Sequence, residues 1–284
     1  MKNAFDYCIE LVRDRDRDRY WCAMLAPAAY RNDLFALYAF NAEIAEIGIS
    51  VSEPLIGQMR LRWWLDVLPG IYAGSPPQQP VAVALSQTVG RRPLAQQRIE
   101  QFLEARQRDL DPAPPPHMRA LLAYADATSG ALLELSLAVM DKTDPASLHA
   151  AHHLGIAWML TGLIRSIPHQ LQRGRSQLPT DLCAKHGFNR QALHDHGYQG
   201  KPPPGFIEVV ADLKAEIFDN LARAGSTPEA AAYASPLLLK RLAQGYMDEL
   251  TRVNNDPFQL NHQRRGPRLR DMIRITWASL IASS

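Results

Sequence analysis

The chain has 284 residues, a length within reach of one large helical domain, and 46% of them are hydrophobic, so a sizeable core can be buried. Charged residues make up 21% and the formal net charge is +2. That near balance gives no global reason to expect a nucleic-acid-binding protein, so any electrostatic function must come from local patches.

The cysteines and the ends of the chain narrow the class of protein further. Cys8, Cys22 and Cys183 lie far apart without a CxxC pair, which indicates a reducing compartment and argues against a zinc site. At the amino terminus, acids and bases precede any apolar run, so we expect no secretory signal. No window of about 18 uncharged apolar residues occurs, and we predict no transmembrane helix.

The first elements are a charged run and a buried helix. The alternating acids and arginines of RDRDRDRY, which end at Tyr20, predict a solvated helix end or turn. The following run LFALYAF is apolar nearly all round, so the helix that contains it should be buried. One face of that helix carries Leu34, Leu37, Tyr38, Asn41, Ala45 and Gly48.

A start signal at Ser52, Glu53 and Pro54 predicts the next helix, which contains QMRLRWWLDVL. Its Trp63 and Trp64 are expected in the core or in a cavity wall. Its arginines, Arg60 and Arg62, could line a cavity or face water, and the pattern does not separate these two positions.

Further helices follow, and no convincing series of alternating strands appears. We predict them at about residues 81–90, 94–110, 117–140, 146–166, 205–224, 228–253 and 267–282. Proline-rich stretches at 75–80, 111–116 and 201–205 are predicted to be stiff loops between helices. The sequence therefore predicts an all-α protein with a single domain over residues 1–284.

A basic stretch, GLIRSIPHQLQRGRSQLP, occupies residues 162–179. It contains three arginines, and no Asp or Glu occurs from Pro145 to Thr180. Pro168 removes one N–H and clashes with the carbonyl four residues before it. The residue before a proline is also pushed away from helical geometry. We therefore predict that this helix kinks or stops near Ser166.

Two other groups of polar residues have spacings that suggest chemistry. His149, His152 and His153 could share a helix face, but no Cys or carboxylate lies nearby in sequence to complete a metal site. Ser166 and His169 could suggest a nucleophile and a base, yet nothing marks a sharp turn or an orienting acid. For both groups a structural role is the expectation.

Several motifs, in this order, resemble the squalene/phytoene synthase family: the YAF helix, the RLRWW helix, EARQRDLD at 104–111, YADATSGALL at 124–133, and the series of arginines that ends at Pro179. The resemblance runs over most of the chain. It implies an isoprenoid-synthase-like helical bundle with a central cavity. Active members of the family join two prenyl diphosphates head to head, with Mg²⁺ held by two acidic clusters.

The first acidic cluster of that family is depleted in this sequence. Its three aspartate positions fall on Ala45, Glu46 and Ile49, and Glu43 lies one turn before them. Glu43 and Glu46 could share a cation, or they could pair with arginines or face a polar cavity. The resemblance implies that a remnant of the cluster's cavity is formed by Tyr38, Asn41, Glu43 and Glu46.

The second acidic cluster is lost. Ser166, His169 and Gln170 occupy its acidic positions, and Gly162 replaces its asparagine. We therefore predict no catalytic residue, no bound metal and no cofactor. The arginines that match the family are Arg165, Arg173 and Arg175. They could hold an anionic or lipid head group without metal, or they could pair with helix C-termini or with acids elsewhere in the fold.

One branch of the family has the same substitutions in kind, and its members help to assemble respiratory complex I, NADH:ubiquinone oxidoreductase. The shared segments are FALYAFNAEIAEIGISVSEPLIGQMRLRWW, PPQQPVAVAL at 76–85 and IRSIPHQLQRGRSQLPTDLCAKHG at 164–187. This resemblance implies a non-catalytic protein whose partners are complex I subunits or assembly intermediates, with a lipid or isoprenoid as a candidate ligand. We expect it in the cytoplasm or in peripheral contact with the inner membrane, on the matrix side if the protein is mitochondrial.

Two alternatives stay open on sequence alone. The first is a Mg²⁺-dependent, head-to-head prenyltransferase that uses Glu43, Glu46 and a distant acid such as Asp126 or Asp181 as metal ligands. The second is a lipid-binding protein with no part in complex I.

Overall fold

The computed structural model describes residues 3–51, 53–191, 200–225 and 235–260, and these ranges contain helices and no strand. The α-helices are α1 (Ala4–Arg15), α2 (Arg17–Met24), α3 (Ala28–Ser50), α4 (Pro54–Tyr72), α5 (Pro80–Val89), α6 (Gln96–Ala105), α7 (Met118–Ala125), α8 (Ala131–Val139), α9 (Pro145–Gln172), α10 (Thr180–Lys185), α12 (Phe206–Arg223) and α13 (Leu239–Arg252). The predicted all-α class is confirmed. Across the described ranges, none of these helices is long and apolar enough to span a bilayer.

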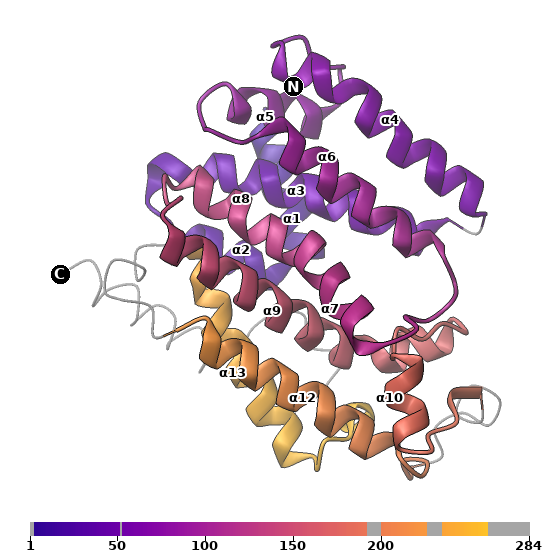
Figure 1. Cartoon of the computed structure of the whole chain (residues 1–284). Coiled ribbons are helices and arrows are strands. Elements are labelled where there is room, and N and C mark those ends of the chain that lie inside the picture. The colour runs from indigo at the N-terminus through magenta and orange to yellow at the C-terminus, as the bar shows by residue number, and fades with distance from the viewer. Residues whose placement is uncertain (1–2, 52, 192–199, 226–234, 261–284) are drawn as a thin grey trace.

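The helices α4, α6, α8, α9 and α12 follow one another across the molecule, each in contact with the next (Figure 1). The buried side chains of the protein form two hydrophobic clusters. One is built mainly from α1, α3, α4, α5 and α6, and the other mainly from α9, α12 and α13. Helix α8 serves both, because Leu132 and Leu135 face the first cluster while Leu133 and Leu137 face the second.

Helix α3 lies at the centre of the first cluster, as its all-round apolar pattern predicts. Phe35, Tyr38 and Phe40 are almost completely buried. The Phe40 ring packs edge-on against Trp64 of α4, with 5.0 Å between the ring centroids, and lies 5.8 Å from the Phe102 ring of α6. Such aromatic contacts join three helices through one side chain.

Several predicted helices are confirmed with small shifts at their ends, and others differ. The helix predicted at 94–110 ends at Ala105 and continues as a 3₁₀ turn. The helix predicted at 117–140 contains a π-turn at Asp126–Gly130. There a Cβ on Gly155 would lie 2.3 Å from the Gly130 Cα, so the two backbones approach closely. The segment 267–282 and the start of 228–253 lie outside the described residues. The sequence-based analysis missed helices α1, α2 and α10.

The helix of the basic stretch was predicted to kink or stop near Ser166, and a stop at that residue is wrong. Helix α9 continues through Pro168 to Gln172. Ile167 and Pro168 are both buried, so tertiary packing on the last turns offsets the hydrogen bond that proline removes. The Ser166 hydroxyl donates to the Leu163 carbonyl and accepts from the Gln170 amide, which adds local side-chain bonds to this turn.

The alternating run of acids and arginines is a helix end, as predicted, but it is not fully solvated. Helix α1 ends before Asp16, whose carboxylate caps α2 by accepting from the Arg19 N–H at 3.1 Å. Asp18 and Arg19 are only 6% and 9% exposed. They are buried because other helices cover this face of α2, which the local charge pattern does not reveal.

Candidate functional site

Buried polar side chains lie where the two hydrophobic clusters meet. The Arg19 guanidinium of α2 lies 5.9 Å from the ring centroid of Tyr38 in the first cluster and 5.9 Å from that of Trp158 in the second. Its charge is paired with Asp16 at 2.6 Å. Burial raises the pKa of the Tyr38 hydroxyl, and the nearby Ser136 hydroxyl opposes that shift only in part. The layer therefore joins the two clusters through the paired charges of Arg19 and Asp16.

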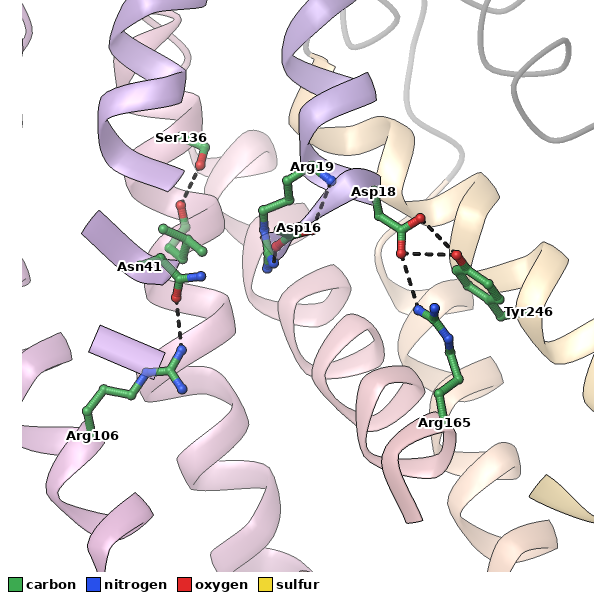
Figure 2. A network of polar contacts seen from close by, with 9 residues as sticks. Asp16, Asp18, Arg19, Asn41, Arg106, Ser136, Arg165 and Tyr246 are labelled. Carbon is green, nitrogen blue, oxygen red and sulfur yellow. Dashed lines mark hydrogen bonds and ion pairs between the residues drawn. The ribbon is translucent and has the colours of Figure 1, made fainter. Parts of the chain in front are cut away.

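Asp18 is the centre of this polar layer (Figure 2). Its carboxylate accepts from Arg165 of α9 at 3.2 Å and from the Tyr246 hydroxyl of α13 at 2.8 and 3.0 Å. The Arg165 guanidinium also lies 3.7 Å from the Tyr246 ring centroid. Burial raises the pKa of Asp18, while the charge of Arg165 and the hydrogen bonds from Arg165 and Tyr246 oppose the shift. Arg165 thus has an acid as its partner inside the fold.

A second polar group occupies the same side of α3. Asn41 accepts from Arg106 at 2.9 Å (Figure 2), and Arg106 also pairs with Asp109 at 3.2 Å. Tyr124 contacts both Arg106 and Asp109. These partners come from the EARQRDLD and YADATSGALL motifs. The resemblance places these motif residues around a central cavity. In the structure they form hydrogen bonds and ion pairs with one another.

The four residues predicted as a remnant of the first acidic cluster divide into two pairs. Tyr38 and Asn41 are three residues apart and face the buried layer. Glu43 and Glu46 share another side of α3, since Glu43 is turned about 200° from Asn41 around the helix. Their side chains line a cavity between α1, α3 and α4. We call this cavity the α1–α3–α4 pocket.

The α1–α3–α4 pocket has a volume of about 360 Å³. Its walls are Tyr7, Leu11, Arg15, Ala42, Glu43, Glu46, Ile47, Arg60, Trp63 and Trp64. Glu46 is paired with Arg15 at 2.8 Å, and Glu43 accepts from the Gln79 amide at 2.8 and 2.9 Å. Burial raises the pKa of Glu43 to about 7, and the Gln79 hydrogen bonds oppose the shift. The pocket thus holds one carboxyl whose charge changes near neutral pH.

The structure distinguishes residues of α4 whose environments the sequence did not resolve. Both tryptophans line the pocket, but Trp64 is buried against Phe40 whereas Trp63 is 40% exposed. Arg60 lines the pocket, whereas Arg62 is exposed and pairs with Asp66 at 2.8 Å. The sequence-based analysis missed Tyr7, Leu11 and Arg15, although Tyr7 and Leu11 have the i, i+4 spacing of one helix face.

The remaining arginines of the basic stretch have different surroundings. Arg175 donates to the Gly48 carbonyl at 2.8 Å, in the last turn of α3. This is the favourable position for a cation beside a helix C-terminus. Arg173 ends α9 and is exposed. Arg165, Arg173 and Arg175 therefore have separate local environments.

The residues present do not fit the two facing acidic clusters that Mg²⁺ needs in the active family pattern. Glu43 and Glu46 already accept from Gln79 and Arg15. The corresponding positions on α9 carry Ser166, His169 and Gln170, which cannot supply a set of carboxylates.

The histidines and the distant acids have local partners. His152 contacts Asp126 at 2.6 Å, and His153 contacts Asn220 at 2.9 Å. Asp181 accepts from the Met118 N–H at the start of α7. Over the ranges that the structure describes, His, Cys, Asp and Glu form no group of three or more arranged as metal ligands. All three cysteines are buried and unpaired with each other.

A comparison with protein families matches residues 12–271 to squalene/phytoene synthases. The chain belongs to the squalene/phytoene synthase family. Solved structures agree on the fold: a dehydrosqualene synthase superposes with a TM-score of 0.78 at 17% identity, over 99% of this chain and 97% of its own. A squalene synthase from Alicyclobacillus acidocaldarius gives 0.76 at 16% identity, over 90% and 95% of the two chains.

Among curated members of the family, NADH dehydrogenase (ubiquinone) complex I assembly factor 6 of Bos taurus is 33% identical over 261 residues, which span 91% of this chain and 77% of that protein. The Homo sapiens protein of the same name is 31% identical over the same shares. A phytoene synthase from Arthrospira platensis is 28% identical over 207 residues, or 68% of this chain and 66% of that enzyme.

Proposed function

We propose that this squalene/phytoene synthase family member is non-catalytic and aids the assembly of respiratory complex I. The main observation behind the proposal is that Ser166, His169 and Gln170 replace the acids of the second cluster. All three lie on helix α9, which continues through these positions. The scaffold of a synthase is kept, while the carboxylates that would hold Mg²⁺ and diphosphate are absent from those positions. The partners are complex I subunits or assembly intermediates.

Two further observations support the proposal. The Bos taurus and Homo sapiens proteins named as complex I assembly factor 6 match over 91% of the chain, whereas the phytoene synthase of Arthrospira platensis matches over 68% and at lower identity. In addition, Arg165 is committed to Asp18 and Tyr246 inside the fold. It therefore serves the packing of α2, α9 and α13 rather than a departing diphosphate.

Deletion of the gene tests the assembly role. We expect a lower level of assembled complex I on native gels and a matching loss of NADH oxidation in membranes, both restored by the wild-type gene. A variant with Ser166→Asp and Gln170→Glu should complement as well, because the proposal assigns no metal chemistry to these positions. Normal complex I in the deletion strain would refute the role and favour a lipid-binding protein unrelated to complex I.

An enzyme assay decides the catalytic question separately. Purified protein is incubated with farnesyl or geranylgeranyl diphosphate and Mg²⁺, and products are extracted and analysed by mass spectrometry. We expect no squalene- or phytoene-like product. Product formation that disappears in a Glu43→Gln, Glu46→Gln double variant would establish the prenyltransferase alternative.

A further inference from the structure

Helix α4 leaves an apolar stripe uncovered in the described structure. Leu55, Met59 and Trp63 follow one another at four-residue spacing and are 64%, 65% and 40% exposed, with Ile56 beside them at 42%. Residues at this spacing lie on one side of a helix. Neighbouring large apolar side chains that stay exposed on one element mark an interaction surface.

Trp63 connects this stripe to the α1–α3–α4 pocket, because it belongs to both. In the pocket, Glu46 and Arg15 neutralise one another. Glu43 is different, since its hydrogen-bond partner is the neutral Gln79. Arg60 is different as well, since its partner is the Ser50 hydroxyl at 3.3 Å. No described residue of opposite charge pairs with either of them, so above pH 7 the pocket presents one anion and one cation.

The aromatic walls determine which ligand would suit these two charges. Tyr7, Trp63 and Trp64 line the pocket beside Glu43, and the indole rings of the two tryptophans meet edge-on at 5.0 Å. Aromatic faces together with a carboxylate favour an ammonium group, and a guanidinium favours a phosphate. A molecule that carries both groups close together complements the pocket, and an attached acyl chain would complement the stripe.

We propose that α4 and the α1–α3–α4 pocket form a membrane-docking surface that binds a zwitterionic phospholipid. The ammonium of the head group lies against Glu43 and the aromatic walls, the phosphate lies against Arg60, and the stripe enters the edge of the bilayer. Arginine and tryptophan side chains suit this interfacial depth. The inference does not depend on a role in complex I.

The charge of the surface favours a zwitterionic bilayer over an anionic one. Peripheral proteins that rely on anionic lipids present clusters of four or more basic residues. Here Arg62 is neutralised by Asp66 and Arg15 by Glu46, so Arg60 is the basic residue of this surface without an acidic partner among the described residues. Apolar insertion and a matched head group must therefore supply the binding.

Flotation of the purified full chain with vesicles tests the proposal. We expect binding at pH 8 to vesicles of equal parts phosphatidylcholine and phosphatidylethanolamine, and roughly tenfold weaker binding to pure phosphatidylglycerol vesicles, a difference of about 1.4 kcal/mol. Met59→Ser should weaken binding to both kinds of vesicle by roughly tenfold through lost apolar insertion. Phe218→Ser, which changes an exposed apolar residue of α12, is the matched control and should bind as wild type.

Variants of the pocket charges test the head-group assignment. Glu43→Gln should abolish the preference for zwitterionic vesicles, because Glu43 binds the ammonium group that phosphatidylglycerol lacks. Arg60→Gln should weaken binding to both kinds of vesicle, because both carry a phosphate. Arg62→Gln on the same helix should bind both as wild type does. Circular dichroism and urea unfolding confirm that each variant is folded.

The pH profile gives a readout that a loss of packing would not produce. The charged or titratable groups around Glu43 are Tyr7, Cys8 and Arg15 on α1, Glu46 on α3 and Arg60 on α4. Burial raises the pKa of Tyr7 and Cys8, so both stay neutral near pH 7. Because the pKa of Glu43 is about 7, wild-type binding should strengthen from pH 6 to pH 8, and Glu43→Gln should remove that dependence.

Three results would overturn the proposal. The first is no flotation with any zwitterionic vesicle, which would assign the stripe to a protein partner. The second is binding that Met59→Ser leaves unchanged. The third is a preference for phosphatidylglycerol that Glu43→Gln does not alter.

Discussion

Two polar regions beside helix α3 of this protein differ in how their charges are compensated. In the layer around Asp18, the charges of Asp16, Asp18, Arg19 and Arg165 are paired within the fold. In the α1–α3–α4 pocket, Glu43 has a neutral partner and lies beside exposed aromatic and apolar side chains. The first region stabilises the core, and the second is a surface pocket with the chemistry to bind a ligand.

The difference shows why motif positions and binding positions need not coincide. The resemblance directs attention to Tyr38, Asn41 and Arg165, and these residues are occupied with internal contacts. A buried charge is costly unless it is paired, so the layer must be compensated in order to fold. Glu43 keeps partial access to solvent, so it can exist with a neutral hydrogen-bond partner and a raised pKa.

The largest effect is expected for Arg165→Ala. It leaves the Asp18 carboxylate buried with only the Tyr246 hydroxyl as a partner from α13, so we expect the free energy of unfolding to fall by about 3–5 kcal/mol in urea titrations. Arg62→Ala, which removes an exposed ion pair, is the control and should change it by less than about 1 kcal/mol. Equal, small losses in both variants would contradict the structural role of the Asp18 layer.

A smaller loss is expected for Tyr246→Phe. The change removes the hydroxyl that donates to Asp18 but keeps the ring that packs against Arg165. Hydrogen bonds to charged groups contribute about 1.5–3 kcal/mol, and we expect a decrease of unfolding free energy within that range. An unchanged urea midpoint would mean that Arg165 alone compensates Asp18.

Glu43→Gln should raise the free energy of unfolding at pH 8, whereas the two changes above lower it. The folded-state pKa of about 7 lies above the ordinary value of 4.5, so the folded protein holds this proton more tightly than the unfolded chain does. The stabilisation from that proton is present below pH 4.5 and is lost as the pH rises through 7. The variant should therefore be more stable than wild type at pH 8, by about 1 kcal/mol after a discount for partial exposure.

Thermal unfolding of wild type and Glu43→Gln across pH 5 to 8 measures this effect. The stability difference between the two proteins should shrink toward pH 5, where wild-type Glu43 is protonated in the folded state. A difference that stays constant across this range would show that Glu43 is ionised throughout and would weaken the contrast with the Asp18 layer.

The smallest effect concerns the basic stretch. Arg175→Gln loses a charged donor to the Gly48 carbonyl near the end of α3, and we expect a decrease of about 0.3–1 kcal/mol in unfolding free energy. The exposed Arg173 provides the paired control, since Arg173→Gln should leave the unfolding free energy unchanged within error. If the two variants behave alike, the Arg175 contact with α3 contributes nothing measurable.

Local pattern was enough to predict much of the fold. The apolar runs and the cap and proline signals predicted α3 as a buried helix, the start of α4, and both ends of α5 and α12 to within a few residues, because helix periodicity depends on neighbouring residues. Local pattern did not predict that helix α9 continues past Pro168. Proline penalises a helix locally, but burial of Ile167 and Pro168 against other elements outweighs that penalty.

By itself, the sequence determined the helical class, the family, and the absence of carboxylates at Ser166, His169 and Gln170, since composition and motif order need no three-dimensional information. Only the tertiary structure decided which charges are compensated. Asp18 and Arg165 are 147 positions apart, and their pairing depends on how α2 and α9 pack. The same packing places Asn41 in the core and Glu43 in the α1–α3–α4 pocket. Side chains two positions apart point to nearly opposite sides of a helix, so these two residues meet different neighbours.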